Sequence, residues 1–233
     1  MKINNTSKKS TKIIKILNSI FYFFLIITFS INFVIYFRPF YYWQIKSLNI
    51  QQTSGYDYQT IKTAYDSIMN YLTLFADYSV GSLKSSAKGQ AHFNDVKILF
   101  IICLTVFLIS LIAVISISFY KLKHKAEFQN TKFTQSFYAS ISIIIFFAVI
   151  TILSAIDFNK AFVIFHKIFF IGKDNWLFDP NQDEIIKILP GEFFRNCAIF
   201  IFVIMFSISF STIIYNIIRF IKLKAKAKKT AIV

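Results

Sequence analysis

Apolar residues gather in four long runs along the chain, at residues 17–37, 98–120, 137–156 and 198–218. None of these runs contains Asp, Glu, Lys, Arg or His. Each is about 20 residues or more, which as a helix covers a hydrocarbon core of about 30 Å. Lipid offers the backbone no hydrogen-bonding partner, so a spanning segment must be helical. The pattern therefore predicts four transmembrane helices.

The overall composition agrees with a membrane protein. Hydrophobic residues make up 56% of the 233-residue chain, and 30 residues are Phe. A soluble core of this size could not hide that much apolar surface, whereas lipid can solvate it. The first run follows a basic tail, as a signal peptide would, but it is too long for an ordinary signal sequence and Arg38-Pro39 makes a poor cleavage site. We expect this run to stay in the protein as a span.

Lys and Arg divide the polar segments into two classes. The tail 1–16, the loop 121–136 and the tail 219–233 hold 15 basic residues and one acid, whereas segments 38–97 and 157–195 hold 11 bases and 10 acids. Basic loops stay on the cytoplasmic side of a membrane. This asymmetry predicts a multi-pass protein with both termini in the cytoplasm and the two balanced segments outside. The net charge of +15 then needs only anionic membrane lipid as its partner, and no nucleic acid.

The first outer segment, 38–97, should contain a helix at about residues 58–75. Its apolar residues recur at helical spacing and form one stripe. The stripe consists of Ile61, Ala64, Tyr65, Ile68, Met69, Leu72 and Phe75. Residues 44–56 and 79–91, in contrast, have the composition of loops.

The second outer segment, 157–195, should contain interfacial helices. Asp157 is a suitable N-cap for the first of them, and Asp179-Pro180 is typical of the start of a short second one. The expected fold is therefore an all-α membrane protein, in which four transmembrane helices carry a mostly helical extracytoplasmic cap.

Chemically active side chains are few. The spans hold no charged residue, which argues against a pump, an ion-coupled transporter or a cation channel. Of three histidines, His124 lies in the cytoplasmic loop, whereas His92 and His166 lie in the two outer segments close to the spans. Asp95 follows His92 by three residues and, on a helix, would share its face. Its carboxylate could orient the imidazole or stabilise the start of the helix, and both roles are compatible.

The two cysteines, Cys103 and Cys197, both lie near the outer ends of spans. A disulfide between them is conceivable from this placement. Small apolar residues that face other helices or lipid would show the same pattern, so whether the two cysteines pair stays open.

Several short motifs occur in a fixed order around the spans. The block His92-Phe93-Asn94-Asp95-Val96 precedes the second span, and Phe165-His166-Lys167 follows the third. Further matches are Tyr65-Asp66-Ser67-Ile68-Met69-Asn70-Tyr71-Leu72, Trp176-Leu177-Phe178-Asp179-Pro180, Asp183 and Leu189-Pro190-Gly191-Glu192-Phe193-Phe194. Together they resemble the lipoprotein intramolecular transacylase (Lit) family, from the first span to the last. Each motif is short, but their order relative to four spans is specific.

The resemblance implies an acyltransferase of the cell membrane with its active site on the outer face. Its substrates would be bacterial lipoproteins with a diacylglyceryl group on the N-terminal cysteine. One acyl chain would move from glycerol to the cysteine α-amine, giving the lyso-form with an N-acyl and an S-monoacylglyceryl group. His92 and His166 would be the catalytic pair, and no cofactor or metal is implied.

The residue chemistry agrees with this reaction. The substrate supplies its own nucleophile, the α-amine, so the absence of a Ser or Cys nucleophile motif fits. A neutral histidine can accept the amine proton. Our hypothesis takes His166 as general base and His92, oriented by Asp95, as general acid or oxyanion stabiliser; the reverse assignment stays open.

Two other functions are compatible with the sequence. A non-enzymatic membrane assembly or interaction protein would have its outer histidines more than about 10 Å apart, because it needs no shared site. An outer-face metal-binding protein would use His92, His166 and either Asp95 or Asp183 as ligands. The sequence does not indicate an oligomeric state.

Overall fold

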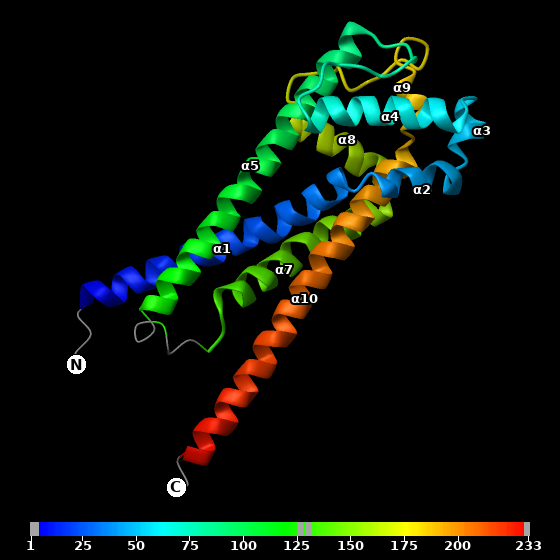
Figure 1. Ribbon diagram of the computed structural model, residues 1–233. Helices are drawn as coiled ribbons and strands as arrows, with labels where there is room; N and C mark the ends of the chain where they lie inside the picture. The colour runs from blue at the N-terminus through cyan, green and yellow to red at the C-terminus, as the bar shows by residue number, and fades with distance from the viewer. Residues whose placement is uncertain (1–4, 125–127, 129–131, 231–233) are drawn as a thin grey trace. The chain divides into compact units, whose positions relative to one another are not determined.

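A computed structural model describes residues 5–124, 128 and 132–230 of the chain, and these residues form helices, turns and loops without a strand (Figure 1). Four helices contain the apolar runs: α1 (Asn5–Tyr36), α5 (Ala87–Lys123), α7 (Gln135–Ile156) and α10 (Gly191–Thr230). Each is long and apolar enough to cross a membrane. The predicted all-α fold with four transmembrane helices is confirmed.

Helix α5 is longer than a membrane span requires. Its 37 residues extend over about 55 Å, whereas the hydrocarbon core is about 30 Å thick. The apolar run 98–120 accounts for the hydrocarbon part, and the polar residues Lys88, His92 and Asp95 come before it. The prediction of a loop through residue 91 was wrong, because the helix already begins at Ala87. His92 and Asp95 are therefore about one turn apart on a formed helix.

The chain divides into two compact units, and the division falls within the four long helices. The first unit contains Met1–Ser30, Thr105–Ile150 and Phe202–Val233. Its buried apolar cluster joins three helices through Ile26, Ile143 and Met205.

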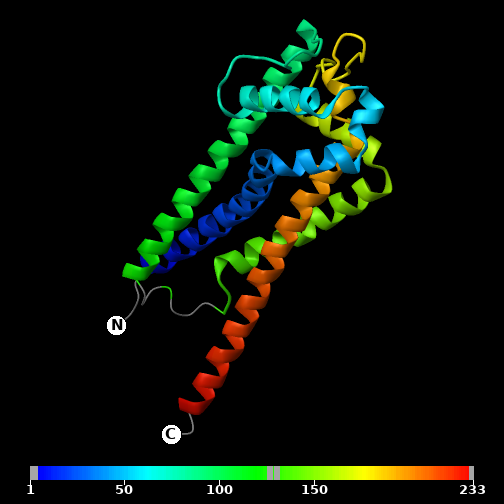
Figure 2. The same cartoon turned by 45° about the vertical axis from the view of Figure 1, so that its right-hand side comes forward.

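The second unit contains Ile31–Leu104 and Thr151–Ile201. It holds the short helices α2 (Pro39–Ser47), α3 (Ile50–Ser54), α4 (Tyr58–Thr73), α8 (Phe158–Phe169) and α9 (Ile185–Ile188). Helices α2, α3, α4 and α9 pack against one another. Figure 2 shows the same short helices in a view turned by 45°.

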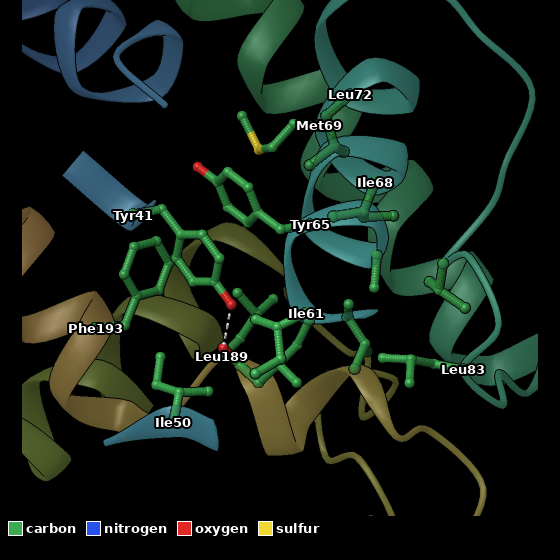
Figure 3. Packing of buried hydrophobic residues seen from close by; sticks show 14 of the residues in the cluster. Tyr41, Ile50, Ile61, Tyr65, Ile68, Met69, Leu72, Leu83, Leu189 and Phe193 are labelled. Carbon is green, nitrogen blue, oxygen red and sulfur yellow. Dashed lines mark hydrogen bonds between the residues drawn. The ribbon is translucent and has the colours of Figure 1, made fainter. Parts of the chain in front are cut away.

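Helix α4 supplies most of the core of this unit. It begins at the N-cap Asp57, whose carboxylate accepts hydrogen bonds from the backbone of Gln59 and Thr60 at 2.8 and 3.0 Å. Six members of the predicted stripe are buried: Ile61, Ala64, Tyr65, Ile68, Met69 and Leu72. Figure 3 shows all of these except Ala64 with labels. Phe75 was assigned wrongly, because the helix ends at Thr73 and Phe75 is 75% exposed.

The prediction of a polar loop at residues 44–56 was also wrong, because most of this segment is helical. Pro39 stands at the first turn of α2, where its fixed φ suits a helix. Gln44 is fully buried, yet its side-chain oxygen accepts a hydrogen bond from Asn196 Nδ2 at 2.7 Å. The Tyr41 hydroxyl donates to the carbonyl of Ile188 at 2.7 Å (Figure 3). Both of these oxygen atoms make hydrogen bonds inside the unit, so the polarity of the two residues did not indicate exposure.

The helix that we expected to start at Asp179-Pro180 begins later. The carbonyl of Asp179 accepts hydrogen bonds from the backbone of Gln182 and Asp183, which makes a turn, and only Ile185–Ile188 is helical. Asp157 is the N-cap of α8 as predicted, because its carboxylate accepts a hydrogen bond from the Lys160 backbone at 3.0 Å.

The core of this unit can be tested by substitution. Ile68 is 1% exposed, so Ile68→Ala should lower the free energy of unfolding by about 2–5 kcal/mol through lost burial and a residual cavity. Thermal unfolding in detergent would measure this. Gln59→Ala, at an exposed position of the same helix, is the control and should change little; equal effects of both would contradict the assigned core.

Candidate active site

The two outer histidines meet in the second unit. His92 comes from the start of α5 and His166 from α8. Their ring centroids are 5.8 Å apart, and the ring planes are inclined by 28°. Both residues are buried, with exposed fractions of 6% for His92 and 7% for His166. The third histidine, His124, belongs to the first unit and stacks on Tyr120. The structure thus brings together the two predicted histidines that come from different outer segments.

Aromatic side chains surround the pair. The Phe170 ring lies 4.9 Å from the ring of His92 and 5.5 Å from that of His166. Trp176 lies 4.8 Å from His166, and Phe178 lies 5.4 Å from His92. These rings carry no negative charge that could stabilise an imidazolium, and they exclude water. They therefore favour the neutral form of both imidazoles.

The charge state of the pair follows from this burial. Burial, and after it the neighbouring His166, lower the pKa of His92 to about 4, against the opposing effects of Asp95 and Asn175. Burial also lowers the pKa of His166, although its hydrogen bond to the Phe162 carbonyl acts in the opposite direction. Both imidazoles are therefore neutral near pH 7 and can accept a proton.

The tautomer of His166 follows from one contact. Its Nδ1 lies 2.7 Å from the backbone carbonyl of Phe162, one turn earlier in α8. A carbonyl oxygen can only accept, so Nδ1 carries the proton. Nε2 is then the atom with the free lone pair, and it is the atom that can act as a base.

Asp95 binds two residues of the segment after α8. Its carboxylate accepts hydrogen bonds from Lys173 Nζ at 2.6 Å and from Asn175 Nδ2 at 2.8 Å. Burial acts to raise the pKa of Asp95, but these bonds and the Lys173 charge hold it below its usual value. Its effect on His92 is electrostatic. We did not single out Lys173 and Asn175 from the sequence, although Asn175 directly precedes the Trp176-Leu177-Phe178 motif.

Asp183 connects the same segment to the start of α5. This residue, 3% exposed, accepts hydrogen bonds from the backbone and hydroxyl of Ser86 at 2.7 and 2.8 Å. The Ser86 hydroxyl in turn accepts one from the Gly89 backbone at 3.0 Å. A carboxylate is stabilised at a helix N-terminus, and here it fixes the turn of α5 that precedes His92.

The described residues include no group of three His, Cys, Asp or Glu side chains that could hold a metal ion. Asp95 and Asp183, the proposed acidic ligands, are both engaged by the hydrogen bonds given above. Cys103 and Cys197 are free, and Cys103 Sγ accepts a hydrogen bond from Asn32 Nδ2 at 3.3 Å.

The family model described as "Lipoprotein intramolecular transacylase Lit" matches residues 16–194, a range that includes both histidines. The chain belongs to the Lit family. The fold of Lit from Bacillus cereus, a membrane-integral lipoprotein intramolecular transacylase, matches with a TM-score of 0.81 and 29% identity, over 94% of this chain and 99% of that one. No curated protein sequence matches the chain.

Two further structures of Bacillus cereus Lit carry a histidine replaced by arginine or by alanine. They match with TM-scores of 0.77 and 0.75 and 30% identity, over 94% and 95% of this chain and 95% and 96% of those chains. The predictions of a Lit-family protein, an acyltransferase and a multi-pass membrane protein are confirmed. The non-enzymatic alternative expected distant imidazoles, whereas the rings in this Lit protein are 5.8 Å apart.

Proposed function

We propose that this Lit protein transfers one acyl chain from the diacylglyceryl group of a lipoprotein N-terminal cysteine to the α-amine of the same cysteine. The amine nitrogen attacks the ester carbonyl carbon, an amide bond forms, the ester C–O bond breaks, and a glycerol hydroxyl is released. The observation that carries the proposal is the pair of buried, neutral imidazoles with centroids 5.8 Å apart. The substrate provides both nucleophile and acyl donor, so the protein has only to orient them and move protons.

We place this reaction at the outer face of the membrane, with both termini in the cytoplasm. The distribution of basic residues supports this orientation. His92 precedes the apolar run of α5, and α8 exposes apolar residues such as Ile164, Phe165 and Ile168. A histidine pair at this position would lie near the headgroup region, where the glycerol ester of a diacylglyceryl group also lies.

The number of protons explains why two histidines are useful. A terminal amine has a pKa of about 8 and exists mainly as an ammonium group near neutral pH, although a desolvated site lowers that pKa. It must lose two protons to become an amide N–H. One of them goes to the departing glycerol oxygen, and the other leaves to water. Two neutral imidazoles can accept these two protons in turn.

The surroundings of each ring favour different roles. His166 gains basicity from its hydrogen bond to Phe162, so we assign it as the general base that takes the proton of the attacking amine. His92, with its pKa near 4, forms the more acidic imidazolium once it is protonated. It is therefore assigned as the general acid that delivers a proton to the glycerol oxygen.

The proposed function can be tested with a purified protein and a synthetic diacylglyceryl lipopeptide in nanodiscs. Because the transfer is intramolecular, substrate and product have the same mass, and tandem mass spectrometry must locate the acyl chain. We expect fragments with an N-acylated cysteine and a monoacylglyceryl thioether. A lipopeptide with an acetylated α-amine is the control and should not react; release of free fatty acid from it would indicate a hydrolase and contradict the proposal.

The rate should depend on pH in a defined way. Below the amine pKa of about 8, the neutral amine increases about tenfold per pH unit, so the rate should rise with a logarithmic slope of about 1. The pKa of each histidine is lowered, so both stay neutral until the pH falls below the usual histidine value of about 6.5. The slope should therefore steepen only below that pH. Single-turnover rates would show this, and a break caused by histidine above pH 6.5 would contradict it.

A further inference from the structure

Two complementary polar atoms at the site are buried without a hydrogen-bond partner. They are Nδ1 of His92 and Oδ1 of Asn175. An unpaired buried polar group costs about 1–3 kcal/mol, so such atoms normally find partners. The two side chains are neighbours, because Asn175 binds Asp95 at 2.8 Å and Asp95 lies about one turn from His92 on α5. In agreement, Asn175 is among the groups that raise the pKa of His92. A protonated Nδ1 can donate and the amide oxygen can accept, so a hydrogen bond between them would satisfy both atoms.

The orientation of the Asn175 amide is determined by Asp95. The ionised carboxylate can only accept, so the amide must direct its NH₂ group toward it, as the 2.8 Å contact from Nδ2 to Asp95 requires. Lys173 binds the other carboxylate oxygen at 2.6 Å and prevents Asp95 from turning away. The carbonyl oxygen of Asn175 is therefore the end left for His92, and a carbonyl oxygen accepts only from an N–H.

We infer that Asn175 is a positioning residue, which bridges Asp95 to His92 and holds His92 as the tautomer with its proton on Nδ1. The inference rests on the proposed function, because it gives this tautomer a task in acyl transfer. With Nδ1 protonated, the Nε2 lone pair of His92 is free, as it is in His166. Neutral His92 then has no N–H at Nε2 for an oxyanion. Its role is to accept a proton and donate it, which removes the oxyanion alternative for this ring.

The bridge also limits how far the nearby carboxylate of Asp95 opposes the burial that lowers the pKa of His92. A carboxylate bonded directly to imidazole stabilises the imidazolium and raises its pKa. An intervening amide transmits orientation without placing the negative charge on the ring, and Lys173 neutralises much of that charge. The ring is thus oriented like the histidine of a hydrolase triad, but it stays neutral and acidic when protonated.

The tautomer can be measured directly. Protein labelled with ¹⁵N-histidine in nanodiscs would give imidazole ¹⁵N shifts, with His92 assigned by comparison with His92→Asn. We expect Nδ1 protonated and Nε2 unprotonated in the unsubstituted protein. Asn175→Ala should produce a mixture of tautomers and lower kcat at least about 10-fold with little change in KM. Asp95→Asn keeps the shape but removes the charge that orients the amide, and it should shift the tautomer in the same direction.

Asp174→Asn is the matched control on the same segment. The Asp174 side chain is 81% exposed and pairs with Lys88 at 3.1 Å, so its replacement should leave tautomer and kcat unchanged. If His92 keeps the same tautomer in both Asn175→Ala and Asp95→Asn, the bridge is only structural and the inference is overturned. Should Asn175→Ala fail to fold, the isosteric Asp95→Asn decides alone. Absence of N-acylated product with the unsubstituted protein would refute the proposed function, and the tautomer spectra would still test the bridge.

Discussion

Replacement of either His92 or His166 by alanine is expected to reduce acyl transfer by at least about 100-fold. General acid–base catalysis contributes about 10²–10⁴ to a rate, and each histidine is proposed to move one of the two protons. The fragment spectrum of the lipopeptide after a fixed reaction time would measure the loss. The double variant should be hardly slower than either single variant, because groups that act as a unit do not give additive losses.

The chain offers a matched control for this experiment. His124→Ala removes the third histidine, which stacks on Tyr120 in the other unit, and it should keep full activity. Thermal unfolding of all variants would separate lost chemistry from lost folding. A folded His166→Ala or His92→Ala protein that still forms product at the normal rate would show that the pair does not carry the reaction.

The sequence predicted those features that depend on one segment at a time. The four spans could be predicted because lipid tolerates no charge, so each run is free of it over its whole length. The stripe of α4 could be predicted because one helical face packs on the core, from Ile61 to Leu72. Phe75 continued the spacing, but the helix had already ended, and periodicity alone does not locate a helix end.

Features that depend on contacts between distant segments could not be predicted in this way. Residues 44–56 looked like a loop because of their polar side chains, yet Gln44 is paired with Asn196, which is 152 residues away in the chain. Asn175 and Lys173 reach Asp95 across 80 and 78 residues. No local pattern distinguishes them from other polar loop residues. The histidine pair could be predicted from the sequence alone, because residue type, placement near the spans and the family motifs all indicated it.

The contacts around Asp183 show how the second unit keeps its two histidines together. His92 is carried by α5, whereas Trp176 and Phe178, which contact the pair, belong to the segment that follows α8. Asp183 joins this segment to the start of α5 through Ser86. The geometry of the pair thus depends on how closely the segment after α8 approaches the turn of α5 that contains Gly89.

Gly89→Ala should disrupt this approach and cause the second large loss of activity. A Cβ at position 89 would lie 2.2 Å from Asp183 Oδ1 and 3.2 Å from Phe178 Cε1. The carboxylate is held by two hydrogen bonds from Ser86, so it cannot move aside freely. Overpacking of this kind costs about 1–3 kcal/mol, more than the gain of up to about 1 kcal/mol from alanine in a helix. We expect a lower unfolding temperature and at least about a 10-fold loss of acyl transfer.

Gly191→Ala provides the comparison, because a Cβ there would have no heavy atom within 4 Å and should leave both stability and activity unchanged. The clash also predicts that the effects of two substitutions are not additive. Because the added methyl group meets the Asp183 carboxylate, Gly89→Ala should cause little further loss of stability or activity in a protein that already carries Asp183→Ala. Independent, additive losses would contradict the clash. Normal activity of Gly89→Ala alone would mean that the segment after α8 can withdraw from α5 without moving the histidines apart, so the Asp183 contact would not position the site.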